Sequence, residues 1–310
     1  MSGATRGGIR AAVQPRVDGP PSAGAPSRRH PRSRLEASLL FLPTSLWLVL
    51  FIVVPLVMFF IYSFWTVKDE FISRGFSLTN YFRFFANGVY PELLGRTFLL
   101  ALGVSVITFV MGYPLALYIS RKSGRTKSIL YMLVMIPLLT SYIVRIYAMR
   151  LILGSNGLIN NLLMVTGIIH EPLPFLLFNL FAIFLTLCVI LAPFMVMPIF
   201  SSLEKVPRSL VEASRDLGAS DFETFWRVIF PLSLPGVIAG FMFIFILTLG
   251  DFLTPILVGG TQGMTFGKII QMNFGIAYDW PFGSSLSVLL LLLSLLIVLL
   301  SSRFGALREI

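Results

Sequence analysis

The sequence predicts an all-α integral membrane protein with six transmembrane helices. Of its 310 residues, 56% are hydrophobic, and the mean hydropathy is +0.87, well above that of soluble domains. Six apolar runs each approach or exceed the roughly 20 residues that a helix needs to cross a bilayer. Lysine and arginine are concentrated between alternate runs, as in multi-pass membrane proteins.

A basic segment precedes the first apolar run. Residues 1–38 are rich in Gly, Pro, Ala and Arg, which predicts a disordered cytoplasmic tail and not a cleaved signal peptide. Residues 39–303 are the predicted transmembrane domain, and residues 304–310 a short cytoplasmic tail. The predicted spans are residues 39–66, 97–119, 129–153, 173–200, 235–258 and 284–302.

The charges between the spans predict the orientation. The basic clusters lie in the N-terminal tail, in 121–127, in 205–227 and after residue 302. Residues 154–172 contain no Lys or Arg, and 259–283 contain only Lys268. By the positive-inside rule both termini are cytoplasmic. The outer segment 67–96 is the exception, since it holds four basic residues beside three acidic ones. The net charge of +10 therefore follows membrane topology, and no nucleic-acid partner is predicted.

Several chemistries lack the residues they need. Cys188 is the single cysteine, so no disulfide framework exists, and two distant histidines predict no metal site. The stretch "GMTFGKI" (263–269) lacks the spacing and the Ser/Thr of a phosphate-binding P-loop. The stretch "GVIAG" (236–240) has the small-xxx-small spacing of close helix packing. A turn and a short amphipathic helix are predicted over 154–174, and a tight start of the last span at 280–283.

The charged segment 201–234 predicts two short amphipathic helices joined by a rigid turn. Gly218 fits a left-handed C-terminal cap of the first helix, and Ser220 with Glu223 fits the capping box of the second. The apolar face of the second helix is expected to carry Phe222, Phe225, Trp226 and Ile229. Two prolines, Pro231 and Pro235, are expected to close it. Amphipathic helices of this kind either lie on lipid headgroups or dock into a partner protein. Acidic residues are mixed with the basic ones here, which favours a protein partner, because an anionic membrane surface prefers a uniformly basic helix face.

Within this segment, Glu212-Ala213-Ser214, Gly218 and Val228-x-Phe230-Pro231 resemble the E-A-A-x3-G-x9-I-x-L-P loop of permease subunits in binding-protein-dependent ABC importers. The resemblance implies the type I importer permease fold (MetI-like), with a coupling loop at about 201–234 that seats in a cytoplasmic ATPase. The coupling residues it implies are Glu212, Ala213, Gly218, Phe222, Phe225 and Trp226.

The resemblance also implies the partners. The chain would be a transporter subunit without an ATPase site or a catalytic residue, with ATP and Mg²⁺ bound by an ABC ATPase dimer. It would work in the bacterial inner membrane beside a second homologous permease, and an extracytoplasmic solute-binding protein would deliver the solute.

Four further stretches resemble a narrower branch, the spermidine/putrescine permeases of the B/H type, and extend the resemblance over about 39–303. They are "GSNGLINNLL" (154–163), "LEKVPRSLVEASRDLGAS" (203–220), "GDFLTP" (250–255) and "DWPFGSSLS" (279–287). The implied solute is a polyamine. An opine, ferric iron or thiosulfate stays open, as does an ATPase-independent channel or carrier; a membrane enzyme would need a cluster of catalytic residues that the sequence does not offer.

One acidic residue within a span needs a role, because an Asp near the centre of a membrane helix costs about 2.5–3.5 kcal/mol on insertion scales. A carboxylate beside aromatic faces suits a polycation, which Asp251 with Phe252 and Asp279 with Trp280 would supply. The alternative for Asp251 is an ion pair with Arg145 or Arg150. The candidate pathway residues are therefore Asp251, Phe252, Asp279, Trp280 and Arg145.

Overall fold

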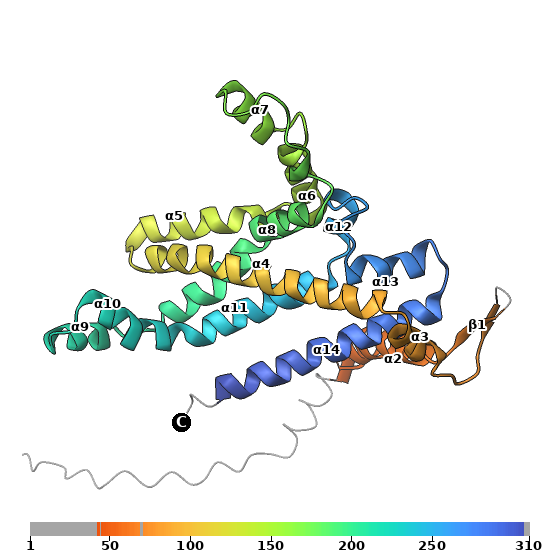
Figure 1. The fold of residues 1–310 in the computed structure, drawn as a ribbon. Helices are drawn as coiled ribbons and strands as arrows, with labels where there is room; N and C mark the ends of the chain where they lie inside the picture. Colours follow the sequence, from red (N-terminus) through yellow and green to blue (C-terminus); the bar gives the residue numbers. More distant parts are fainter. Residues whose placement is uncertain (1–41, 44, 69–70, 307–310) are drawn as a thin grey trace, which may run out of the picture. The chain divides into compact units, whose positions relative to one another are not determined.

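The structure is a computed structural model that describes residues 42–43, 45–68 and 71–306, most of them helical (Figure 1). The predicted tail 1–38 and the last four residues of the chain lie outside the described residues. The chain divides into two compact units, residues 1–54 and 55–310. In the described part of the first unit, a helical stretch leads into the π-helix η1 Val49–Val53, and the rings of Trp47 and Phe51 lie 4.2 Å apart.

Five helices are long and apolar enough to cross a membrane, and one bent pair of helices makes a sixth span among the described residues. The five are Ser45–Tyr62, Val89–Ser120, Leu180–Leu203, Asp221–Gly250 and Trp280–Ser301. The bent pair is Gly124–Leu139 with Tyr142–Val165. Each predicted span overlaps one of these six, so the prediction of a six-helix membrane protein is confirmed.

Three helices form the centre of the second unit and run side by side in Figure 1. They are α4 Val89–Ser120, α8 Leu180–Leu203 and α11 Phe230–Gly250. Their shared core includes Leu100, Val104, Leu187, Met195 and Ile244. The last helix, α14 Trp280–Ala306, packs along α11 and begins where the sequence predicts.

Two glycines let α8 and α11 approach closely. A Cβ built on Gly236 would lie 2.3 Å from the Pro198 carbonyl oxygen and 2.4 Å from Ser202 Oγ. On Gly240 it would lie 2.9 Å from Met195 Sδ. Since only a hydrogen fits at Gly236, the 236–240 stretch is a packing motif, as predicted.

The third predicted span is not one straight helix. Helix α5 Gly124–Met135 runs into the 3-10 helix η2 Ile136–Leu139, and after two non-helical residues α6 Tyr142–Leu153 begins. The two halves of the span meet at 94°. Pro137 stands in the first turn of η2, where a missing N–H costs little. Beyond α6 lies the predicted amphipathic helix, α7 Leu158–Val165, followed by η3 Pro174–Leu176.

The fifth predicted span is also interrupted. Helix α11 ends at Gly250, Asp251 is extended with ψ 124°, and α12 Leu253–Val258 follows. In a continuous helix the Asp251 carbonyl would accept from residue 255, and Pro255 has no N–H to give. The expectation that Asp251 lies near the centre of a helix is therefore wrong, because it lies at a helix end.

The segment between the first two spans, predicted as an outer loop, is structured. It contains the antiparallel hairpin β1 Thr66–Lys68 and β2 Phe71–Ser73, in which Val67 pairs with Ile72. The neighbouring helices are α2 Val54–Tyr62 and α3 Thr79–Ala86. The Asn80 side chain donates to the carbonyls of Ser63 at 3.2 Å and Trp65 at 2.8 Å, which holds α3 to the chain before the hairpin.

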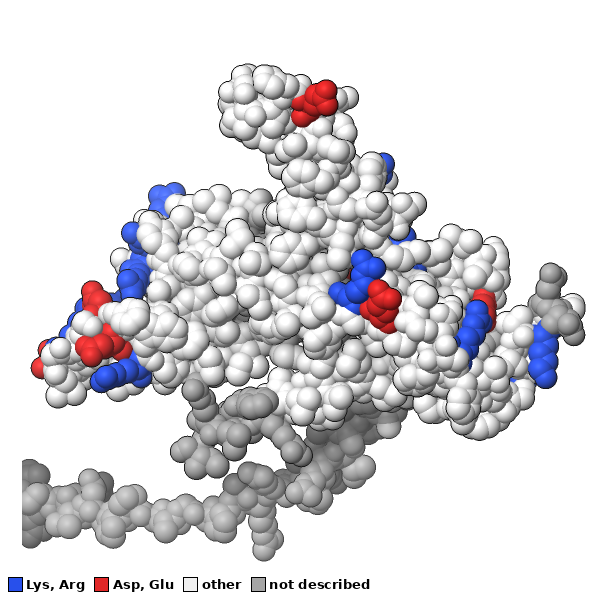
Figure 2. Space-filling model, in the orientation of Figure 1, with Lys and Arg blue, Asp and Glu red and all other residues white. Residues whose placement is uncertain are grey.

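Charged side chains gather at one end of the second unit, and on the rest of the visible face they lie in a few separate groups on a mostly uncharged surface (Figure 2). This end carries α9 Arg208–Asp216 and α10 Asp221–Thr224. At this end Lys127, just inside α5, lies 2.5 Å from Glu204 at the end of α8. The basic segments 121–127 and 205–227 therefore share one end, as the positive-inside rule requires of a membrane protein.

Candidate functional site

The 201–234 segment is a rigid helix–turn–helix, as predicted. Between α9 and α10, Gly218 has a φ of 85°, a left-handed conformation that glycine adopts at little cost. The hydroxyls of Ser214 and Thr224 lie 3.0 Å apart and join the two helices. Arg215 pairs with Asp221 at 2.9 Å across the same turn.

The predicted capping box is present at the start of α10. The Ser220 N–H donates to the Glu223 carboxylate at 2.9 Å, and the Glu223 N–H donates to Ser220 Oγ at 3.3 Å. The Ser220 hydroxyl donates to the same carboxylate at 3.0 Å, and Arg227 lies 3.8 Å from it. These contacts hold the box closed.

The second helix does not close at its prolines, contrary to the prediction. Helix α10 continues through the π-helix η4 Phe225–Ile229 into α11, and Pro231 and Pro235 lie inside that helix. The Phe230 N–H donates to the Phe225 carbonyl, five residues back. The hydrogen bonds change from the α-helical to the π-helical register just before Pro231, which lets the helix continue although proline has no N–H to donate.

The predicted coupling residues differ in their exposure. Glu212, Ala213 and Gly218 are exposed, as are Phe222 (72%) and Trp226 (49%). Two further leucines between residues 208 and 226 are exposed. We refer to the four exposed large side chains as the apolar loop residues: Leu210, Leu217, Phe222 and Trp226. Exposed apolar groups on a rigid helical unit are typical of a docking surface.

Phe225 faces the protein interior instead. Its half-buried ring lies 5.8 Å from the ring of Tyr113 in α4. The Tyr113 hydroxyl lies 2.8 Å from Ser233 Oγ in α11. Phe225 therefore anchors the 201–234 segment to the membrane helices. The sequence analysis missed Tyr113, for which a tyrosine next to Pro114 within an apolar run was the available signal.

A second candidate site lies at the break between α11 and α12. Asp251 Oδ1 accepts from the Thr254 N–H at 3.5 Å, a long contact. Asp251 Oδ2 is buried and has no hydrogen-bond partner among the described residues. Thr254 Oγ1 lies 3.1 Å from the hydroxyl of Tyr142 in α6, a neighbour of Asp251 that the sequence analysis also missed.

Arg145 does not pair with Asp251, which was the alternative prediction. No ion pair within 4.0 Å joins the two side chains in the described part of the chain. Arg145 Nη1 donates to the Ile190 carbonyl of α8 at 3.2 Å, and its guanidinium lies 5.6 Å from the Tyr142 ring centroid. Arg150, the other predicted partner, lies 5.5 Å from the Phe178 ring centroid. Among the residues that the structure describes, the carboxylate therefore lacks a cationic partner.

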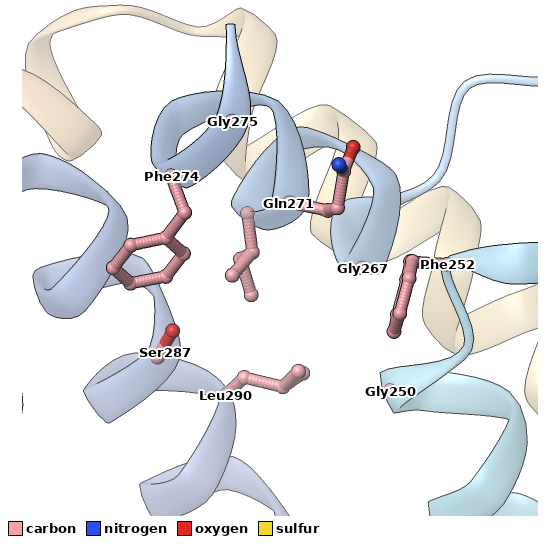
Figure 3. A pocket seen from close by; sticks show the side chains of 9 residues that line it. Gly250, Phe252, Gly267, Gln271, Phe274, Gly275, Ser287 and Leu290 are labelled. Carbon is pink, nitrogen blue, oxygen red and sulfur yellow. The ribbon is translucent and has the colours of Figure 1, made fainter. Parts of the chain in front are cut away.

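Phe252 and Asp251 do not form one site. Phe252 faces a cavity of about 460 Å³ beside α13 Phe266–Gly275 (Figure 3). Phe274 lines the same cavity across from Phe252, with the Gln271 amide between them. The Asp251 side chain is not part of this lining. The cavity is mostly apolar and suits an apolar chain better than an ammonium group.

Asp279 is already paired. Its Oδ2 lies 2.7 Å from Arg83 Nη1, and its Oδ1 accepts the Phe282 N–H at 3.2 Å, which caps α14. The Arg83 guanidinium also lies 4.0 Å from the Phe282 ring centroid. Trp280 beside it is half exposed, with its ring 6.0 Å from Phe274. Asp279 thus joins α3 to α14, and its charge is neutralised within the protein.

The part of the chain that contains the 201–234 segment and Asp251 matches a known protein family. Residues 109–307 match the family described as "Binding-protein-dependent transport system inner membrane component". The spermidine/putrescine transport system permease protein PotB of Escherichia coli (strain K12) is 36% identical over 258 residues, 83% of this chain and 93% of that protein. PotB of Haemophilus influenzae is 33% identical over 83% of this chain and 90% of its own length.

The fold has solved counterparts as well. One chain in the crystal structure of a bacterial ABC transporter involved in the import of the acidic polysaccharide alginate matches with a TM-score of 0.67. The match covers 89% of this chain and 96% of that chain at 17% sequence identity. At this identity the likeness concerns the fold.

Proposed function

This chain belongs to the family of binding-protein-dependent transport system inner membrane components, and from that membership we propose that it is a permease subunit of an ABC importer for polyamines such as spermidine and putrescine. It is a multi-pass protein of the inner membrane. The observation that carries the substrate class is the 36% identity to a spermidine/putrescine permease over 83% of the chain.

In this proposal the 201–234 segment is the coupling loop and seats in a groove of a cytoplasmic ATPase. The support is its rigid turn together with the exposed apolar loop residues, which suit helix-in-groove docking. Glu212, exposed on α9, is the polar anchor. Because α10, η4 and α11 form one continuous helix, a displacement of the docked segment moves α11 directly. Phe225 carries the same displacement to Tyr113 in α4.

The proposal includes the rest of the importer. An ABC ATPase dimer binds ATP and Mg²⁺, so this chain has no nucleotide site of its own. Each ATPase subunit takes one coupling loop, which requires a second permease subunit, and we propose a homologous chain in preference to a second copy. A solute-binding protein delivers the polyamine at the opposite, outer face, and both termini are cytoplasmic. The support for this orientation is the clustering of residues 121–127 and 205–227 at one end.

The test is transport by the reconstituted importer. The permease pair and ATPase are placed in liposomes with ATP on the ATPase side and the solute-binding protein on the other. Uptake of labelled putrescine and spermidine is expected, with dependence on both ATP and the binding protein. An opine, ferric iron and thiosulfate serve as competing solutes, and preferred uptake of one of them would reassign the substrate. Polyamine uptake by this chain without the ATPase would instead indicate a channel or carrier.

A further inference from the structure

Four buried polar side-chain atoms lack a hydrogen-bond partner within the described ranges of the chain. They are Arg145 Nε, Thr186 Oγ1, Thr248 Oγ1 and Asp251 Oδ2. Arg145 belongs to α6 and Thr186 to α8, whereas Thr248 and Asp251 lie at the C-terminal end of α11. Helix α12 follows the end of α11 and packs against both α6 and α8. An unpaired buried polar atom costs about 1–3 kcal/mol, and more when it is charged. Their origin in helices around α12 therefore indicates a polar site whose three unpaired oxygen atoms have no donor among the described residues.

The contacts of neighbouring residues connect α8 to α12 and to Arg145. On α8, Thr186 lies between Ile183 and Ile190. A Cβ built on Gly259, at the end of α12, would lie 2.7 Å from Ile183 Cδ1. The Ile190 carbonyl accepts a hydrogen bond from Arg145 Nη1. Thr248 lies one turn before Asp251 on α11, and its hydroxyl is on the buried part of that helix.

The cationic side chains around α12 are held by backbone carbonyls. Lys268 donates to the carbonyl of Gly260 at 2.8 Å and to that of Pro255 at 3.4 Å. Arg145 donates to Ile190 and lies over the Tyr142 ring. Neither forms an ion pair with Asp251 in the part of the chain that the structure covers. Asp251 is therefore buried without a counter-ion among the described residues, an arrangement that is costly for the ionised carboxylate unless a proton or a bound cation neutralises it.

The chemistry of the site selects the kind of cation. Carboxylate and hydroxyl oxygens accept hydrogen bonds, and a primary ammonium offers three donors and no acceptor. A divalent metal ion would require several more oxygen ligands than a single carboxylate and neutral hydroxyls provide. The Tyr142 hydroxyl lies 3.1 Å from Thr254 Oγ1, whereas the hydroxyls of Thr186 and Thr248 have no partner among the described residues and are open as acceptors.

We propose that the junction of α6, α8 and the α11–α12 break binds one ammonium group of the transported polyamine, with Asp251 as its counter-ion and Thr186 and Thr248 as hydroxyl acceptors. This inference rests on the proposed function, since it assigns a site for that substrate within the membrane domain. The site differs from the apolar cavity that Phe252 lines and from Asp279, whose charge Arg83 neutralises.

The first experiment measures uptake by the reconstituted importer with Asp251→Asn. This change keeps the shape and removes the charge. A lost hydrogen bond to a charged group corresponds to about a 10- to 100-fold lower uptake efficiency for spermidine. The yield of the assembled complex is expected to be unchanged, because no buried protein cation loses a partner. The matched control, Asp279→Asn, opens the half-exposed ion pair with Arg83 and is expected to change uptake by less than about fivefold.

A second measurement does not depend on transport. Spermidine is expected to raise the unfolding temperature of the purified permease–ATPase complex in the absence of the solute-binding protein, and Asp251→Asn is expected to abolish that rise. Thr186→Val and Thr248→Val each remove an unpaired hydroxyl at constant volume. A structural role predicts equal or higher stability for these variants and no change in spermidine binding. The ammonium site predicts binding weakened by about 2- to 10-fold.

Three outcomes would overturn parts of this reasoning, and they are distinguishable. Normal uptake and normal spermidine stabilisation of Asp251→Asn would remove the ammonium site while polyamine import by the parent protein stands. Loss of the complex in Asp251→Asn, restored by Arg145→Gln, would show that Asp251 pairs with Arg145 in the assembled importer. Absence of polyamine uptake by the parent importer would refute the proposed function itself.

Discussion

Replacing Gly236 by alanine tests the contact between α8 and α11. The added Cβ would lie 2.3 Å from the Pro198 carbonyl oxygen, 2.4 Å from Ser202 Oγ and 2.8 Å from Ser202 Cβ. Ordinary contact begins near 3.4 Å, so the two helices must separate by about 1 Å locally. The nearest atom belongs to the backbone of α8, and rotation of a side chain cannot move it away.

The magnitude follows from two opposing effects. Overpacking of a filled interior costs about 1–3 kcal/mol, and a clash with backbone falls at the upper end. Alanine in place of glycine gains about 1 kcal/mol of helix propensity. The net loss is about 2 kcal/mol, or roughly a 30-fold lower folded-to-unfolded ratio. At Gly240 the nearest atom is Met195 Sδ, at the far end of a flexible side chain, at 2.9 Å, so Gly240→Ala is expected to cost less.

The assay is the unfolding midpoint of the purified complex, measured with heat and with a denaturing detergent. The matched control is Gly95→Ala in α4, where a built Cβ meets no atom of the described residues within 4 Å. The expected order of stability is Gly95→Ala, Gly240→Ala and then Gly236→Ala. A Gly236→Ala protein as stable as Gly95→Ala would refute the close approach of the two helices.

Three further predictions concern coupling and orientation. Gly218→Pro cannot adopt the φ of 85° at its turn, so this variant, and likewise Glu212→Lys alone, should lose stimulation of the ATPase while membrane insertion persists. The control is Gly167→Pro, at a glycine with a φ of 72° outside this segment. Full ATPase stimulation in the Gly218 variant contradicts the docking role. Trp226→Ala should weaken co-purification of the ATPase and leave the stability of the chain unchanged. Phe225→Ala should destabilise the chain by about 2 kcal/mol, because the half-buried Phe225 ring packs on Tyr113. The reverse pattern would mean that Phe225 is the docking residue. With Cys188 replaced, cysteines at Ser123 and Ser209 should react with reagents from the cytoplasmic side and cysteines at Asn156 and Gln262 from the outer side, and outer labelling at Ser209 would exclude contact with a cytoplasmic ATPase.

The spans and the helix–turn–helix were predictable because their determinants are local. A membrane span requires a run of about 20 predominantly apolar residues, so the six apolar runs are sufficient to locate six spans. The capping box at Ser220 and the left-handed glycine at Gly218 depend on hydrogen bonds within a few residues. Such features are specified by the sequence wherever the helices finally pack.

The helix breaks were not predictable by the same argument. The residues on either side of Thr140 and of Asp251 are all apolar enough to continue a span, and the 94° bend leaves hydropathy unchanged. Pro231 was misread for the converse reason, since proline ends an isolated helix but is tolerated when a π-turn precedes it. Tertiary contacts decide between these outcomes.

The partners of the acidic residues depended on the fold as well. Arg83 and Asp279 are 196 positions apart in the chain and meet only because α3 packs against α14. Arg145 was the natural partner for Asp251 by hydropathy alone, yet its guanidinium lies against the Ile190 carbonyl and the Tyr142 ring. No spacing rule in the sequence separates a distant ion pair from a carboxylate left unpaired.

The π-helical stretch η4 has a geometric consequence for the coupling loop. A π-turn contains one residue more than an α-turn, and one residue of an α-helix corresponds to a rotation of about 100° and a rise of about 1.5 Å. Because the π-turn accommodates its extra residue within one turn, deleting one residue within 225–229 so that the helix becomes regular would leave α9 and α10 facing nearly the same direction. Rewinding η4 as a regular α-helix without a deletion would instead rotate α9 and α10 around the axis of α11 by about that angle. Phe222 and Leu217 would keep their exposure and face another direction. The choice between a π-turn and an α-turn at 225–229 is therefore able to set the direction in which an unchanged surface is presented.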